Sequence, residues 1–178
     1  MKNLFLLLIA TLTLSSCDKD NDNPPPTNPV DQLPPPTQTG ENTFGCLLDG
    51  QVFLPGNGTN SLDCVYQFVD GGYYFSLQAN KRDSNNIPLR LGCGTQKFQI
   101  FEGQAYQLKE KADGNAYGKY SYAANFTYTS QLQTGELKIS KLDFTNNIVS
   151  GTFWYDIIDY QGVTHQIREG RFDMQFTQ

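Results

Sequence analysis

The chain has 178 residues, with 13 basic and 18 acidic side chains and a formal net charge of −5 at pH 7. Its basic residues form no cluster, and a mildly acidic chain argues against nucleic acid, whose binding depends on Lys and Arg contacts to phosphate. The same charge argues against direct electrostatic binding to anionic lipid. Length and composition therefore fit one globular domain, preceded by an N-terminal segment of different character.

The chain begins with the pattern of a bacterial lipoprotein signal peptide. Lys2 supplies a positive charge, residues 4–14 form a short apolar run, and Leu14-Ser15-Ser16-Cys17 has the form of a lipobox. The run is too short to span a bilayer, so we expect a signal peptide at residues 1–16 that is removed, and the residue order disfavours a buried core helix. Cys17 is then the expected mature N-terminus, carrying diacylglycerol and palmitate-type acylation as the contact with the membrane.

An acidic cluster follows this cysteine directly, with Asp18, Asp20 and Asp22. It resembles the export signal that sends lipoproteins of Bacteroidetes to the exterior face of the outer membrane; a plain solvated tether is the alternative. The three aspartates also have the spacing of a calcium loop. However, Asn23 replaces the turn glycine and Pro29 replaces the bidentate glutamate, so no metal site is predicted.

Residues 17–40 are expected to form a disordered linker that is rich in proline. Two proline triplets, at 24–26 and 34–36, favour an extended polyproline II conformation. About 17 extended residues at ~3.1 Å each would hold the domain ~50 Å from the lipid. A proline-rich ligand for a partner domain is the alternative.

Residues 41–178 alternate apolar and polar side chains with period two almost throughout, which is typical of strands with one buried face. Turns are predicted at residues 49–50, 70–72, 83–86, 146–147 and 159–162. Outside the signal peptide, only residues 105–111 admit a short helical turn. The pattern predicts a single all-β domain, an antiparallel β-sandwich or open barrel of about 8–11 strands.

Four segments of this domain carry a resemblance to a known family: Thr43-Phe44-Gly45-Cys46-Leu47-Leu48-Asp49-Gly50, the strand 135–143, Gly151-Thr152-Phe153, and Glu169-Gly170-Arg171-Phe172-Asp173. Together they resemble a family of small uncharacterised lipoproteins of Bacteroidetes that is defined only as a domain of unknown function. The resemblance covers most of residues 41–178 and is strongest after residue 134. It implies membrane anchorage and an all-β domain, and it brings no activity and no functional residues.

The same motifs have a plain physical interpretation. Glycines at 151 and 170 permit β-bulges, and the phenylalanines at 153 and 172 face the core. Arg171 and Asp173 share the opposite face of one strand. A cross-strand salt bridge is therefore expected there, in preference to a binding site.

Three cysteines remain after lipidation of Cys17, and the expected compartment is oxidising. If Asp70-Gly71 is a hairpin loop, Cys64 lies opposite Leu77 and Cys93 lies one strand further. That separation is about 10 Å, above the ~7 Å limit for Cα atoms joined by a disulfide. Cys46 is the more plausible partner for one of the two, which leaves one buried thiol.

Residues with catalytic chemistry are few. His165 is the only histidine and shares its register with Val163 and Ile167, so we expect a core or cross-strand histidine. Three cysteines and this histidine lack the spacing of a zinc site. A hydrolase of the cell envelope would need two carboxyl groups that act as acid and base. The candidates are Glu102, Asp156, Asp159 and Glu169. No catalytic residue or cofactor is assigned.

An aromatic stripe is the remaining functional feature. Tyr120, Tyr122, Phe126 and Tyr128 are expected on one face of a strand, with Ala124 between them, and the three tyrosines are the candidate ligand contacts. Core packing is one interpretation, and a partly exposed platform for a sugar ring or a peptide is the other. We therefore predict a non-catalytic, lipid-anchored β domain that binds a glycan or protein ligand or serves a structural role in the envelope. A carboxylate-dependent hydrolase is the alternative.

Overall fold

A computed structural model describes residues 28–178, and in this range the chain is all-β apart from one 3₁₀ helix, η1 (Pro29–Gln32). The predicted all-β class is confirmed, with eleven strands in a single sheet. The strands are β1 (Thr43–Leu48), β2 (Gln51–Phe53), β3 (Leu62–Val69), β4 (Gly72–Arg82), β5 (Pro88–Gln96), β6 (Ala105–Leu108), β7 (Asn115–Tyr122), β8 (Asn125–Tyr128), β9 (Gly135–Asp143), β10 (Ile148–Ile158) and β11 (Thr164–Gln175).

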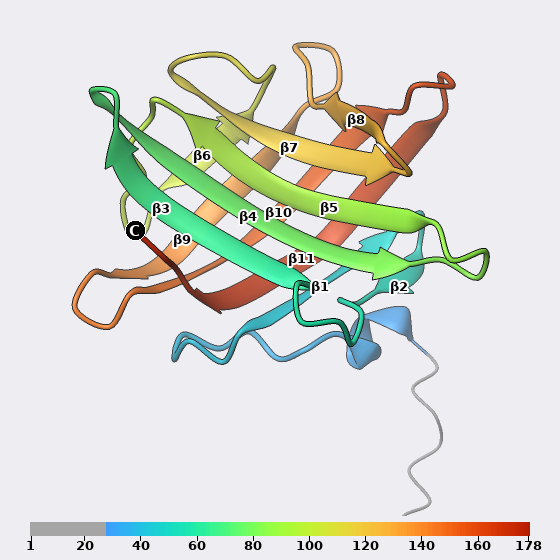
Figure 1. Ribbon diagram of the computed structural model, residues 1–178, viewed down its shortest axis with the longest axis horizontal. Helices are drawn as coiled ribbons and strands as arrows, with labels where there is room; N and C mark the ends of the chain where they lie inside the picture. Colours follow the sequence, from blue (N-terminus) through green and yellow to red (C-terminus); the bar gives the residue numbers. More distant parts are fainter. Residues whose placement is uncertain (1–27) are drawn as a thin grey trace, which may run out of the picture.

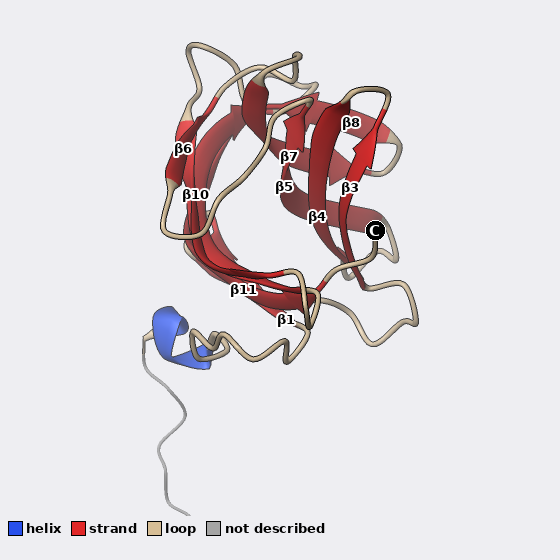
Figure 2. Ribbon diagram, turned by 90° about the vertical axis from the view of Figure 1, so that its left-hand side faces the viewer, coloured by secondary structure: helices blue, strands red, loops and turns tan. Residues whose placement is uncertain are grey.

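The strands follow the order β2-β1-β11-β10-β9-β6-β7-β5-β4-β3, and β8 pairs with β7 beside this path. All strand pairs are antiparallel except β6–β7. The sheet curls strongly about its core (Figures 1 and 2), which corresponds to the open-barrel alternative. A parallel bridge between Val65 and Thr177 connects β3 to the chain after β11, so residues from both sides of the curl meet.

The five turns that the sequence predicted are all present, whereas the turn between β7 and β8 was not predicted. The β3–β4 hairpin pairs Val69 with Gly72, and Asp70 and Gly71 between them adopt positive φ angles of 48° and 74°. A glycine adopts such angles without steric cost, and an aspartate tolerates them better than most residues. The predicted helical turn within residues 105–111 is wrong: residues 105–108 form β6, which pairs with β9.

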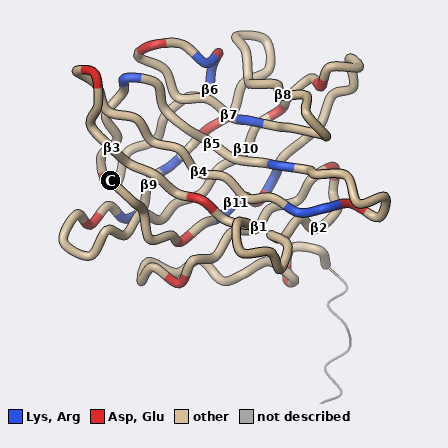
Figure 3. The backbone as a smooth tube through the Cα atoms, in the orientation of Figure 1, with Lys and Arg blue, Asp and Glu red and all other residues tan. Residues whose placement is uncertain are grey.

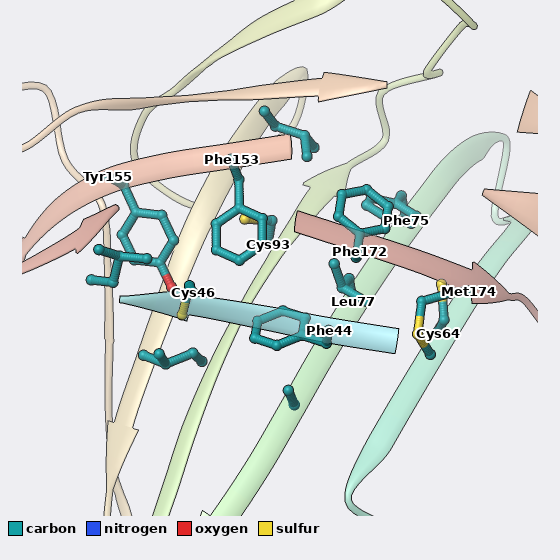
Figure 4. Packing of buried hydrophobic residues seen from close by; sticks show 14 of the residues in the cluster. Phe44, Cys46, Cys64, Phe75, Leu77, Cys93, Phe153, Tyr155, Phe172 and Met174 are labelled. Atoms are coloured by element: carbon teal, nitrogen blue, oxygen red, sulfur yellow. The ribbon is translucent and has the colours of Figure 1, made fainter. Parts of the chain in front are cut away.

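Large side chains fill the inside of the curled sheet (Figure 4). The ring of Phe153 packs between Phe44 and Phe172, with centroid distances of 5.2 and 6.4 Å, and all three residues are at most 3% exposed. Tyr155 is fully buried, and its hydroxyl donates to the carbonyl oxygen of Lys119 at 2.7 Å. This hydrogen bond compensates for the burial of a polar atom in the core.

The three remaining cysteines are free and buried. Cys64 and Cys93 lie opposite Leu77 from its two sides, as the hairpin loop predicted. The expected disulfide to Cys46 is wrong, because all three side chains pack into the core as small apolar groups. Burial raises the pKa of each thiol, which opposes thiolate chemistry.

Residues 28–40 of the predicted linker are ordered, so the expectation of a disordered linker is wrong for this part. Asn28 caps η1 by accepting a hydrogen bond from the Val30 amide at 3.1 Å. We call residues 33–41 the strap. Leu33 is 7% exposed, and Pro34 occupies the space that a Cβ atom on Gly45 would need. Figure 2 shows η1 outside the curve of the sheet.

Asp173 of β11 holds the other end of the strap. Its carboxylate accepts hydrogen bonds from the amides of Thr39, Gly40 and Glu41 at 2.8–3.2 Å, and from the Ser150 hydroxyl at 2.7 Å. Burial works to raise the pKa of Asp173, but these donors outweigh it and lower the pKa to about 2. The strap has a composition typical of disordered segments, and a carboxylate more than a hundred residues away in the chain holds it in place.

The expected salt bridge between Arg171 and Asp173 is wrong, because backbone amides of the strap occupy the aspartate. Arg171 instead lies 3.5 Å from the carboxylate of Glu169. The predicted signal peptide, Cys17 and the acidic cluster of Asp18, Asp20 and Asp22 lie outside the described residues. Within residues 28–178, no helix has the length and apolar character needed to cross a membrane.

Candidate functional site

A groove of about 540 Å³ lies on the outer face of the sheet, over β9, β10 and β11. We call it the outer groove. Side chains of three strands form its floor, and Pro36 of the strap contributes to its wall. Its lining residues are Pro36, Glu136, Thr152, Phe153, Trp154, Arg168, Glu169, Gly170 and Arg171.

A β-bulge shapes this groove. Phe153 pairs with Gly170 and Tyr155 pairs with Ile167, so two residues of β11 lie opposite Trp154 alone. One of them, Glu169, has a positive φ of 54°. A Cβ atom on Gly170 would lie 2.5 Å from the ring and the carbonyl oxygen of Phe153. The bulge predicted at this glycine is therefore confirmed, and it re-aims the side chains of β11 at the outer face.

Trp154 is the only tryptophan of the chain, and its side chain is 41% exposed. The guanidinium of Arg168 lies 5.6 Å from its ring centroid, within the range of a cation–π contact. Three acceptors fix that guanidinium: Asp156 at 2.6 Å and the carbonyl oxygens of Ile167 and Tyr155 at 2.9 and 3.2 Å. Arg168 thus positions the indole, whose remaining surface is free for a ligand.

Polar side chains stand beside the indole on the same face. Glu136 of β9 pairs in register with Trp154, and Thr152 lies one pleat further along β10. Both side chains are exposed. The groove therefore combines an aromatic surface with a carboxylate and a hydroxyl, the kind of lining that orients small polar ligands.

The four segments singled out in the sequence analysis meet at or beside this groove. Thr152 and Phe153 belong to the segment 151–153, Glu169 to Arg171 belong to the segment 169–173, and Glu136 lies in the strand 135–143. Gly45 of the segment 43–50 pairs with Arg171, and Pro34 of the strap packs against Gly45. The plain physical roles that we expected for Gly170 and Phe153 hold, and they also build the groove.

The sequence did not draw attention to Trp154. Strand alternation could have placed it, because Phe153 and Tyr155 point inward and the tryptophan between them must point outward. The groove itself requires three strands, a bulge and the strap together. Local patterns of one strand contain no information about that combination.

A second polar cluster lies where the β1–β2 and β10–β11 turns meet, and it contains His165. Nδ1 of His165 lies 2.7 Å from Asp49, and Nε2 lies 3.5 Å from Asp159. The imidazole stacks on Tyr120, with ring centroids 4.6 Å apart and planes inclined by 17°. This agrees with the predicted cross-strand histidine: Ile167 on its register is buried, although Val163 is half exposed.

The groups around His165 shift the pKa values of their neighbours. Burial works to raise the pKa of Asp159, but the amides of Val163 and Gln161 together with His165 outweigh it and lower the pKa. Burial, followed by the charges of Asp159 and Asp49, raises the pKa of Tyr120 to about 12. We interpret this cluster as a polar junction that joins two turns, not as the binding site.

The three tyrosines proposed as a platform do not share a face. The chain reverses after Tyr122, so Tyr128 lies on β8 and pairs with Lys119, while Tyr120 pairs with Thr127. Tyr120 is 5% exposed and belongs to the core, and Tyr122 donates to Asp83 at 2.8 Å. The expected single stripe is wrong because the turn falls inside it.

The four carboxylates proposed for hydrolysis are dispersed. Glu102 lies 3.9 Å from Lys141, Asp156 is paired with Arg168, and Asp159 lies in the cluster around His165. Of the four, only Glu169 lines the outer groove. Residues 28–178 contain no group of three or more histidine, cysteine or acidic side chains arranged to hold a metal ion.

Basic and acidic residues are interspersed over the described strands, as Figure 3 shows. Comparisons of the chain with family models, with curated proteins and with solved structures found no match. The geometry of the outer groove therefore carries the functional argument.

Proposed function

We propose that this protein is a lipid-anchored protein of the cell envelope whose β domain binds a glycan in the outer groove. The observation that carries the proposal is the exposed indole of Trp154, fixed by Arg168 and flanked by the free polar groups of Glu136 and Thr152. An aromatic face offers apolar area to the C–H face of a sugar ring, and carboxylate and hydroxyl groups bond to its hydroxyls.

The sequence supports the location of this activity. The lipobox that ends in Cys17 favours anchorage to a membrane, and the acidic cluster after it favours the exterior face of the outer membrane. Replacing Asp18, Asp20 and Asp22 by alanine should leave the protein lipidated but facing the periplasm. Protease treatment of intact cells measures this, and equal removal of variant and wild type would contradict surface display.

A glycan array with the purified protein tests the binding proposal. We expect binding to a limited set of glycans, and Trp154→Ala should weaken it at least tenfold, since buried aromatic anchors dominate binding energy. Phe126→Ala is the matched control, because Phe126 is an exposed aromatic residue on β8 outside the groove. Equal loss in both variants, or binding that Trp154→Ala leaves intact, would contradict the assignment.

A protein ligand or a structural role in the envelope is the second outcome of that array, and it would follow if no glycan bound. The hydrolase alternative has less support. Glycoside hydrolysis requires a general acid in an apolar environment opposite a second carboxylate, whereas Glu136 and Glu169 in the groove are both exposed. Release of reducing ends from an array-positive glycan would favour the hydrolase.

A further inference from the structure

Some of the charged side chains that line the outer groove form ion pairs within residues 28–178, and one does not. Arg168 is engaged by Asp156 and by two backbone carbonyl oxygens, as described above. Its positive charge is therefore already paired with a carboxylate of the protein, and three of its five N–H groups are used. A carboxylate on a ligand would have to share this guanidinium with Asp156, which lies 2.6 Å away.

The second guanidinium of the groove, that of Arg171, is also paired with a carboxylate of the protein. Nε of Arg171 donates to the carbonyl oxygen of Glu169 at 3.3 Å, and its terminal nitrogen lies 3.5 Å from the carboxylate of the same residue. The Arg171 side chain is only 18% exposed, whereas that of Glu169 is 54% exposed. The part of this pair that faces solvent is thus the acidic one.

Glu136 is the charge in the groove that is left unpaired. Within residues 28–178, its carboxylate makes no hydrogen bond and no ion pair, although it stands beside Trp154 on the same face. The nearest basic position along β9 is Lys138, which pairs in register with Thr152 on the same face but does not line the groove and lies one pleat further than Glu136 from the indole. The free charge that a ligand meets beside the indole is therefore negative.

We infer that the outer groove selects neutral saccharides and rejects those that carry carboxylate or sulfate groups, an inference that rests on the proposed glycan binding. The sugar ring packs on Trp154, and its hydroxyls donate to the carboxylate of Glu136 and exchange hydrogen bonds with Thr152. An anionic sugar in the same place meets an unpaired like charge, and the charges of both guanidiniums that could offset it are already paired with Asp156 and Glu169.

Two sets of oligosaccharides of equal length test this inference: neutral tetrasaccharides of glucose, mannose and galactose, and those of the corresponding uronic acids. Binding is measured by calorimetry and by the fluorescence of Trp154. We expect at least one neutral tetrasaccharide to bind at least tenfold more tightly than its uronic acid counterpart. Because salt screens like-charge repulsion, the difference should shrink as ionic strength rises.

Glu136→Gln is the decisive variant, since it keeps the shape and removes the charge. It should weaken binding of the neutral ligand about tenfold. It should also reduce the ratio between the affinities for the neutral saccharide and for its uronic acid counterpart. Lys138→Gln is the matched control on the same strand and face, and it should leave the neutral affinity unchanged. Both variants should have the melting temperature of the wild type, which checks that the fold is retained.

The outcomes separate the two proposals. A wild-type preference for the uronic acids would overturn the selectivity and leave the groove as a glycan site. A preference for neutral sugars that Glu136→Gln does not change would also overturn the inference, because the free carboxylate would then play no part. Failure of every saccharide to bind would overturn the proposed function together with the selectivity.

Discussion

The attachment of the strap to Asp173 can be tested by removing one negative charge. Asp173→Asn preserves the shape of the side chain but places an amide where three backbone N–H groups and the Ser150 hydroxyl now donate to a carboxylate. An amide has one acceptor oxygen, and its NH₂ group would face donors. The variant should therefore lose most of these hydrogen bonds while the core of the sheet stays intact.

The shifted pKa gives the magnitude. The pKa of Asp173 falls from 3.8 to about 2 in the folded protein, which corresponds to about 2 kcal/mol of stability at neutral pH. Asp173 is 1% exposed, so solvent screening is small. For a domain of this size, a loss of about 2 kcal/mol lowers the melting temperature by roughly 4–8 °C.

The sign of the pH dependence follows from the lowered pKa. A carboxylate with a depressed pKa stabilises the fold fully above its unfolded pKa of 3.8, and this stabilisation disappears as the pH falls towards about 2. Urea unfolding of wild type and Asp173→Asn between pH 7 and pH 2 should give curves that differ by about 2 kcal/mol above pH 5 and converge near pH 2.

Asp63→Asn provides the control, because Asp63 is exposed on β3 and makes no hydrogen bond through its side chain among the described residues. It should change stability by less than about 0.5 kcal/mol. The reasoning is refuted if Asp173→Asn is as stable as wild type at pH 7, or if its deficit persists unchanged at pH 2. Amide exchange of Thr39 and Gly40 should accelerate in the variant, since these amides lose their acceptor.

Three further predictions follow from the sequence and the packing. Cys17→Ala should abolish incorporation of labelled fatty acid and either release the protein from the membrane or leave it unprocessed, and a mutant that is still labelled would contradict the lipobox. Tyr120→Ala should cost about 3–5 kcal/mol in chemical denaturation because it leaves a cavity, whereas Tyr128→Ala should cost about 1 kcal/mol or less; equal losses would contradict their placement on opposite faces. Gly170→Ala should destabilise the domain by about 1–3 kcal/mol because its Cβ meets Phe153, and an unaffected melting temperature would argue against the tight bulge.

Features set by neighbours in the sequence were predictable. The hairpin at Asp70-Gly71 fixed the register of β3 and β4, and with it the position of Cys64 opposite Leu77. The reversal at Ala123-Ala124 was not predictable in this way, because it lacks the glycine or asparagine that usually marks a turn, and Ala123 adopts a positive φ of 55°. That turn splits the tyrosine stripe.

Features that depend on residues far apart in the chain could not be predicted from the sequence. The order of the strap comes from Asp173, whose acceptor atoms no local pattern connects to residues 39–41. The outer groove depends on a bulge in β11, an outward residue of β10 and the strap. Composition indicated an exposed binding surface with aromatic residues, but not which of them would be fixed beside free polar groups.

Fluorescence of Trp154 tests the central claim most directly, because this chain has a single tryptophan and it lies in the outer groove. Titration of the purified protein with an array-positive glycan should change its emission in a saturable manner and with one ligand per chain, at the affinity found by calorimetry. Binding by calorimetry with no change in the emission of Trp154 would place the ligand elsewhere and contradict the assignment of the groove.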